Sequence, residues 1–142
     1  MPRTRYASGA PWEAAVGYSR AVRVGPFVHV AGTTATDADG APLAPGDAGR
    51  QAEIVLAKVR DALERAGAGL ADVVRTRIYV TDIADWPAVG RAHGAAFGDV
   101  RPAATMVQVA ALIDPALVVE IEADAIVAEP PGDGADRAQR RA

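Results

Sequence analysis

The sequence predicts one α+β domain in which a single mixed β-sheet carries two helices on one face. Five segments have the pattern of a strand, either alternating apolar and polar residues or forming a short apolar run, and two segments repeat their apolar residues at helical spacing. In chain order these segments read β-β-α-β-α-β-β. We expect the domain to occupy residues 1–128 and the tail, residues 129–142, to be disordered, because the tail has no core-forming residues.

The first two strands form a predicted hairpin. Residues 18–24 alternate in polarity, residues 27–31 are an apolar run, and Gly25-Pro26 between them is a turn pair. Residues up to about position 16 mix polar residues with glycine and proline. We therefore expect them to be a lead-in arm.

Two helices flank the third strand. Residues 47–66 repeat apolar side chains at helical spacing and stop at Gly67, and residues 73–80 then return to the period of a strand. Asp85 is a predicted N-cap, with a proline in the first turn after it, and the second helix stops at Gly98.

The last two strands are the most apolar part of the chain. We expect them over residues 103–112 and 117–127, separated by an Asp-Pro turn signal. In the second of them one face is apolar and the other carries Glu120, Glu122 and Asp124, because strand side chains alternate.

Three carboxylates in a row repel one another, so they require cations, hydrogen-bond donors or water. Arg75 and Arg77 share a face of the preceding strand. One interpretation is an ion-pair lattice across the strands, which suits Glu122 and Asp124. The other is that Glu120 lines a pocket and handles a proton or a water molecule. Spacing alone does not separate them.

Composition excludes several kinds of function. Cysteine is absent and the only histidines are His29 and His93, so we expect no metal site. A net charge of -3 with dispersed signs argues against a nucleic-acid partner. Because the sequence has neither a signal peptide nor an apolar run long enough to span a bilayer, we expect no membrane association and a cytoplasmic location.

His93 lies in the second helix between Gly90 and Gly94. Each glycine weakens a helix by roughly 1 kcal/mol relative to alanine, so the pair indicates a close approach of backbone, partner or ligand. A single helical histidine is either a surface or packing residue or a group that transfers a proton.

The two helices can cover only one face of the sheet. Strand residues are apolar on both faces, as Val28, Val30, Val107 and Val109 show. A second copy of the chain would bury the other face, which predicts a homo-oligomer with any pocket between subunits.

Four motifs carry a resemblance to a known family: Gly17-Tyr18-Ser19-Arg20, Val28-His29-Val30-Ala31-Gly32, Arg101-Pro102-Ala103 and Val119-Glu120-Ile121-Glu122-Ala123. Together they resemble the Rid family, also called YjgF, over roughly residues 16–127. The resemblance implies a chorismate-mutase-like fold and a homotrimer whose sheets form a central barrel with clefts between subunits. It also implies hydrolysis of small reactive enamines and imines to a keto acid and ammonia, with no metal or organic cofactor.

The family's functional residues carry over in part. Tyr18 matches the pocket tyrosine and Glu120 matches the carboxylate that handles water. The family's Pro-Ala-Arg-Ser run departs at two positions, and two other sites change as well: Ala104 replaces the arginine that grips the substrate carboxylate, Thr105 the serine, Ala31 the serine before Gly32, and Gln108 a glutamate.

Alanine cannot make the bidentate, charge-assisted contact of an arginine. We therefore expect a larger or less acidic substrate than the usual 2-imino acid. Arg20 or Arg101 could take the arginine's place, although strand alternation puts Arg101 on the opposite face from Ala104.

The resulting hypothesis is a hydrolase or deaminase acting on an imine, enamine or enol intermediate. Glu120 serves as general base or water-positioner with its pKa raised by desolvation, Tyr18 and Thr105 orient the substrate, and His93 is a candidate proton donor. The alternative is a non-catalytic trimer that binds a metabolite or a partner protein. The missing arginine favours this alternative.

Overall fold

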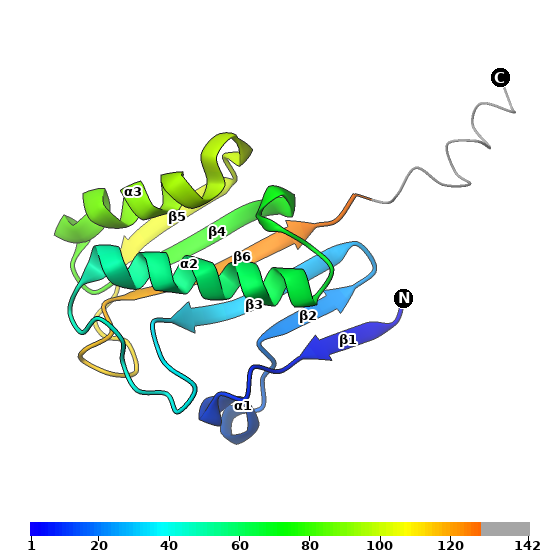
Figure 1. Cartoon of the computed structure of the whole chain (residues 1–142), viewed down its shortest axis with the longest axis horizontal. Helices are drawn as coiled ribbons and strands as arrows, with labels where there is room; N and C mark the ends of the chain where they lie inside the picture. The colour runs from blue at the N-terminus through cyan, green and yellow to red at the C-terminus, as the bar shows by residue number, and fades with distance from the viewer. Residues whose placement is uncertain (129–142) are drawn as a thin grey trace, which may run out of the picture.

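The computed structural model describes residues 1–128; the predicted disordered tail lies outside the described residues. One six-stranded sheet carries α2 (Ala48–Arg65) and α3 (Trp86–Phe97) on the same face (Figure 1). The strands are β1 (Arg3–Tyr6), β2 (Ala21–Val24), β3 (Phe27–Thr34), β4 (Val73–Val80), β5 (Ala103–Gln108) and β6 (Val119–Ile126), and a short helix, α1 (Pro11–Val16), follows β1. The α+β prediction is confirmed.

The strand order across the sheet is β1-β2-β3-β6-β4-β5. β4 and β5 pair in parallel and all other neighbours pair antiparallel, so the sheet is mixed, as predicted. The last strand of the chain, β6, is therefore inserted between β3 and β4. This position places Glu120, at the start of β6, directly opposite Thr34 at the end of β3.

Helix α2 packs across β3 and β6 and next to α3. Asp47 caps it by accepting a hydrogen bond from the Arg50 backbone amide. Its apolar stripe, including Val55, Val59 and Leu63, is fully buried. Burial of this stripe against the sheet forms the core, as the helical spacing predicted.

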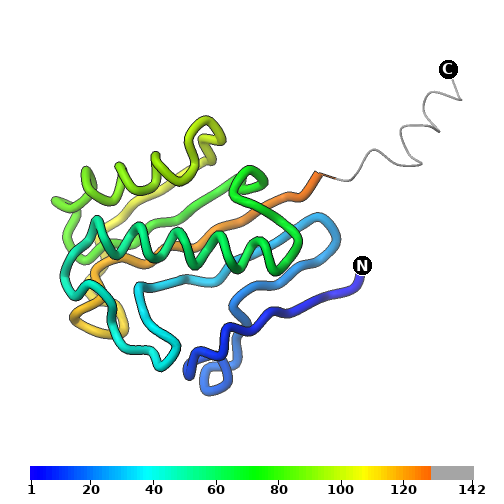
Figure 2. Tube along the Cα trace, in the orientation of Figure 1, coloured from blue at the N-terminus to red at the C-terminus, as the bar shows by residue number. Residues whose placement is uncertain are grey.

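The lead-in arm is more structured than predicted. It contains β1, which extends the sheet beyond β2, and α1, whose Glu13 is buried. Figure 2 shows α1 at the end of the sheet that also holds the loop after β3. Sequence reasoning missed β1 because four residues of mostly polar, exposed edge strand give no apolar alternation.

The predicted strand over residues 103–112 ends at Gln108, and the next begins at Val119 rather than at 117. Gln51 of α2 accounts for the later start of β6. Its side-chain amide donates to the Ala116 carbonyl at 2.8 Å, and its Oε1 accepts from the Val118 amide at 2.9 Å. A buried helix side chain thus satisfies backbone groups that a strand partner would otherwise bind.

The structure also differs from two smaller expectations, which concern the Asp85 N-cap and the two glycines of α3. Asp85 lies at the N-cap of α3, with a proline in the first turn, but its side chain makes no capping hydrogen bond. A Cβ placed on Gly94 would meet no atom within 4 Å, and one on Gly90 would meet only Trp86, at 3.9 Å. No segment of residues 1–128 therefore approaches either glycine closely.

Candidate active site

A cavity of about 370 Å³ opens at the end of the sheet where β3 and β6 meet the N-terminal arm and α2. Of the sequence-predicted site residues it contains Tyr18, Arg20 and Glu120. The other lining residues used below are Trp12, Gly32, Thr34, Thr36, Asp37, Lys58, Asp61, Arg65 and Ile113.

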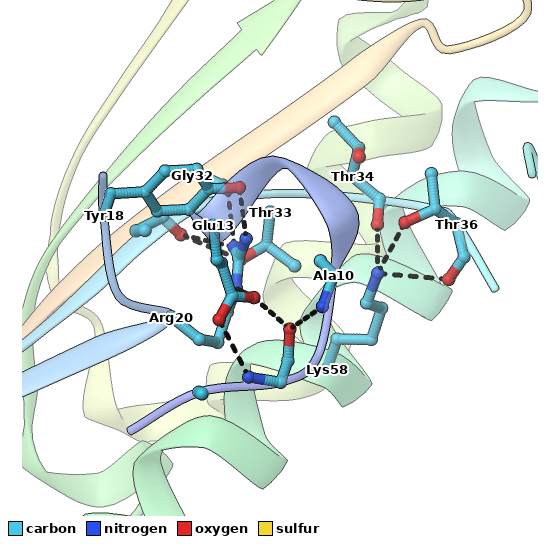
Figure 3. A network of polar contacts seen from close by, with 12 residues as sticks. Ala10, Glu13, Tyr18, Arg20, Gly32, Thr33, Thr34, Thr36 and Lys58 are labelled. Atoms are coloured by element: carbon cyan, nitrogen blue, oxygen red, sulfur yellow. Dashed lines mark hydrogen bonds and ion pairs between the residues drawn. The ribbon is translucent and has the colours of Figure 1, made fainter. Parts of the chain in front are cut away.

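The guanidinium of Arg20 organises one wall of this cavity (Figure 3). Its Nη1 donates to the Gly32 carbonyl at 2.6 Å and to Thr33 Oγ1 at 2.9 Å, and its Nη2 donates to the Tyr18 hydroxyl at 3.1 Å. Only 11% of the Arg20 side chain is exposed. Because the Tyr18 oxygen accepts from Arg20, its own hydrogen is left to be donated to another group.

Glu120 lies over the backbone of Gly32. A Cβ on Gly32 would stand 2.5 Å from Glu120 Oε2 and 3.0 Å from its Cδ, so glycine leaves the space that the carboxyl group occupies. A register shift between Val30 and Thr33 disrupts the β3–β6 ladder at this point. The sheet thereby admits a carboxyl group close to its own backbone.

Burial raises the pKa of Glu120, the neighbouring Glu122 raises it further, and Arg20 partly opposes both. This is the direction that the sequence analysis expected. A carboxyl group with a raised pKa exchanges protons closer to neutral pH than an exposed one, so Glu120 is suited to general acid–base chemistry.

Lys58 of α2 forms part of the same cavity lining. Its Nζ donates to the Thr34 carbonyl at 2.7 Å, to the Thr36 carbonyl at 3.1 Å and to Thr36 Oγ1 at 3.0 Å (Figure 3). Burial lowers the pKa of Lys58, the charge of Arg20 lowers it further, and Asp37 opposes them. Sequence reasoning placed Lys58 on the polar face of the helix. The missed signal is that it is the only lysine in the chain.

Glu13 of α1 is a second buried charge that the sequence did not reveal. It accepts hydrogen bonds from the Ser8 amide at 3.0 Å and from the Ser8 hydroxyl, and it lies 3.8 Å from Arg20 Nε. Burial acts to raise its pKa, but the bonds from Ser8 and the charge of Arg20 outweigh burial and hold the pKa below its usual value. Glu13 thus ties the N-terminal arm to Arg20.

The remaining predicted site residues on β5 and next to it do not line this cavity. β5 is an edge strand, separated from β3 by β6 and β4. Ala104 pairs with Thr76, Thr105 is exposed, and Gln108 Oε1 accepts from the Ile83 amide at 2.9 Å. Arg101, also exposed, has a φ of 48° just before the strand.

His93 and Ala31 are placed differently again. His93 Nε2 lies 2.9 Å from Thr76 Oγ1, and its ring centroid lies 4.6 Å from that of Phe97. Burial lowers its pKa. His93 is therefore packed between α3 and β4, away from Glu120, whereas Ala31 contributes its carbonyl oxygen to the surroundings of Arg20, 3.5 Å from Nη1.

Glu122 and Asp124 form the ion-pair lattice that one interpretation of the sequence predicted. Arg77 Nη1 lies 3.3 Å from a carboxylate oxygen of each, and His29 Nδ1 lies 2.7 Å from Asp124 Oδ1. The Tyr79 hydroxyl donates to Glu122 at 3.0 Å. Of the three carboxylates on this face, Glu120 alone lines the cavity.

Within residues 1–128 no group of three or more histidine, aspartate and glutamate side chains is placed to hold a metal ion. None of the described helices is long and apolar enough to cross a bilayer.

The mixed sheet with two helices on one face defines a chorismate-mutase-like α+β fold, and the cavity at the end of β3 and β6 places a raised-pKa carboxyl group in a small-molecule pocket. The family model described as Endoribonuclease L-PSP matches residues 8–127. The chain therefore belongs to this family, which includes proteins named YjgF, RutC and RidA.

Several relatives have informative names. An uncharacterized protein of Streptomyces coelicolor is 39% identical over 85% of this chain and 90% of its own length. A 3-aminoacrylate deaminase, RutC, of Acinetobacter baylyi is 34% identical over 73% of this chain and 82% of its own. A crystal structure of a YjgF/YER057c/UK114 family member from Mycobacterium tuberculosis is similar with a TM-score of 0.81 and 55% identity, covering 89% of this chain and 100% of that one.

Proposed function

We propose that this protein hydrolyses a reactive imine, enamine or enol intermediate, with Glu120 as the group that moves the proton. The supporting observation is the juxtaposition of three groups in one cavity. The Glu120 carboxyl group lies against Gly32, Tyr18 has a hydroxyl hydrogen to donate, and Arg20 holds that tyrosine in place. A relative is named as a deaminase of 3-aminoacrylate, which is an enamine.

These groups suit the chemistry of C–N hydrolysis. For an imine, the Glu120 carboxylate takes a proton from water as the water oxygen bonds to the imine carbon. It returns that proton to the nitrogen to give a carbinolamine, and then carries the carbinolamine's hydroxyl proton to the amine as the C–N bond breaks, which releases ammonia and leaves a carbonyl compound. An enamine first accepts a proton on carbon from the protonated form of Glu120. The raised pKa brings the exchange between the two forms closer to neutral pH than in an exposed glutamate.

The size of the cavity supports a substrate larger than the usual 2-imino acid. Its volume of about 370 Å³ lies in the range of pockets for drug-sized ligands, and an imine of a three-carbon acid would leave most of it empty. Trp12 and Ile113 give part of the wall an apolar character.

We propose further that the functional unit is a homotrimer in which a neighbouring subunit contributes to the cleft. The sheet face away from the helices exposes apolar side chains on two of its strands at Phe27 (43%) and Ile126 (44%), and Val107 on β5 is 43% exposed. Burial of this face would remove apolar surface from water. In such a trimer, β5 of a neighbouring subunit would place Thr105 and its neighbours on the Glu120 side of the cleft. Within one chain, β5 does not line the cavity.

A non-catalytic trimer that binds a metabolite or a partner protein is the second candidate. It is favoured by the hydrogen bonds that Arg20 already makes within the chain: the guanidinium donates to Gly32, Thr33 and Tyr18, so fewer of its donors face a substrate carboxylate. This candidate predicts ligand binding without turnover.

Ammonia release from freshly generated imines of increasing size separates the two candidates. We expect release above the uncatalysed rate for at least one imine larger than that of a three-carbon acid, and its loss in Glu120→Gln. The control is Asp124→Asn, which removes a carboxylate from the same face of the same strand but outside the cavity lining. Thermal stabilisation by keto acids without any ammonia release would refute the hydrolase and support the binding protein.

A further inference from the structure

Lys58 is the only lysine in a chain that contains fourteen arginines, and it lies in the cavity wall. Where only a positive charge on a helix surface is needed, this chain uses arginine. An ammonium group differs from a guanidinium in being a compact point charge with three donors. A lysine at this half-buried position in the cavity wall therefore indicates a requirement for that compact charge.

The ammonium group of Lys58 is surrounded by neutral oxygens. Its three partners are the two carbonyls and one hydroxyl of Thr34 and Thr36, and none of the ion pairs within residues 1–128 includes it. Hydrogen bonds satisfy its donors but do not neutralise its charge. Removing such a charge from water is unfavourable, and an anion that entered the cavity would offset that cost.

Among residues 1–128, none of the other charged groups that line the cavity forms an ion pair with Lys58. Arg20 and Arg65 line the cavity as cations, and Asp37, Asp61 and Glu120 line it as acids. Arg65 is engaged by the Ala7 carbonyl at 2.6 Å. Burial lowers the pKa of Lys58, Arg20 lowers it further and Asp37 opposes them, so a carboxylate bound near Nζ would act in the same direction as Asp37.

We propose that Lys58 is the anion-binding residue of this cavity and holds a carboxylate of the substrate, the role that Ala104 leaves open on β5. The proposal rests on the proposed function for the identity of the substrate as an imine or enamine. It adds that the substrate is an organic acid, and that Lys58 on α2 of the same subunit binds its carboxylate. Trp12 and Ile113 line the same cavity and would contact the apolar body of that acid.

The single lysine allows a direct test in the wild-type protein. Lysine labelled with ¹⁵N at Nζ gives one side-chain signal in this chain. Benzoate carries a carboxylate on an apolar ring, and benzamide is its uncharged counterpart. We expect millimolar benzoate to shift the Lys58 signal and to raise the Lys58 pKa, and benzamide to do neither. An unmoved signal, or an equal response to both probes, overturns the proposal.

Single substitutions test the role of Lys58 through the affinity for benzoate. Lys58→Met keeps most of the apolar side chain and should weaken benzoate binding by about tenfold or more, the usual loss when a charge-assisted hydrogen bond is removed. Arg50→Met removes an exposed cation from the same helix and should change the affinity less than twofold. Equal effects of the two substitutions would show only a response to net charge and would refute the assignment.

The readouts distinguish this proposal from the proposed function. Loss of benzoate binding in Lys58→Met, with turnover of imines unaffected by Glu120→Gln, would leave the anion site standing and remove the hydrolase mechanism. Turnover that requires Glu120, with benzoate binding unchanged in Lys58→Met, would do the reverse.

Discussion

Replacing Gly32 with alanine should separate catalysis from stability. The new Cβ would stand 2.5 Å from Glu120 Oε2, whereas an ordinary contact is about 3.4 Å, so the carboxyl group must move by about 1 Å. The backbone of Gly32 does not lie in the left-handed region, and the atom in the way is the end of a flexible side chain. We therefore expect the free energy of unfolding to fall by no more than about 1 kcal/mol.

A displacement of about 1 Å in a catalytic group lowers turnover by about 10²-fold, or about 2.7 kcal/mol in activation free energy. Ammonia release from the best imine substrate gives the rate, and denaturant unfolding gives the stability. Gly94→Ala is the matched control: its Cβ meets nothing within 4 Å in this chain, so it should raise stability by about 1 kcal/mol and leave the rate unchanged. Turnover in Gly32→Ala within twofold of wild type would refute the placement of Glu120.

Three further predictions concern other parts of the molecule. Burial lowers the pKa of His93 in the folded protein, so the unfolded chain binds its proton more readily; the free energy of unfolding should fall as pH drops through about 6.5, and His93→Asn should flatten this dependence in urea titrations. Arg77→Met breaks partly exposed pairs with Glu122 and Asp124 and should cost less than about 1 kcal/mol, with a smaller loss in high salt; a larger loss would show that the lattice is structural. Light scattering should give three times the chain mass, and a monomer at micromolar concentration would contradict the trimer.

Much of the fold follows from local periodicity. Strand β4 and helix α2 agree with their predicted bounds to within a residue or two, because each presents a regular apolar stripe to one core. The alternation along β6 correctly separated buried residues such as Ile121 from its carboxylates. The start of β6 was not predictable from periodicity, because a side chain distant in sequence, Gln51, binds the backbone of the preceding loop.

The candidate site was likewise predictable where local motifs define it, and not where contacts distant in sequence define it. Tyr18, Arg20 and Glu120 were proposed from motifs and do line one cavity. Lys58 and Glu13 were missed, since a charged residue on a helix is expected to face water. Their partners in the fold are Thr34 and Thr36 for Lys58, and Ser8 and Arg20 for Glu13. His93 was proposed as a proton donor, but the contacts with Thr76 and Phe97 that place it away from Glu120 arise only from the packing of α3 on β4.

The most direct test of the mechanism is the pH dependence of kcat/KM for imine hydrolysis in wild-type protein and in Glu120→Gln. If the Glu120 carboxylate is the base, the wild-type rate should fall on the acid side of a pKa above the ordinary glutamate value of about 4.3. The variant should be slower by about 10²-fold or more and should lack this acid limb. An unchanged rate and an unchanged limb in Glu120→Gln would show that another group moves the proton.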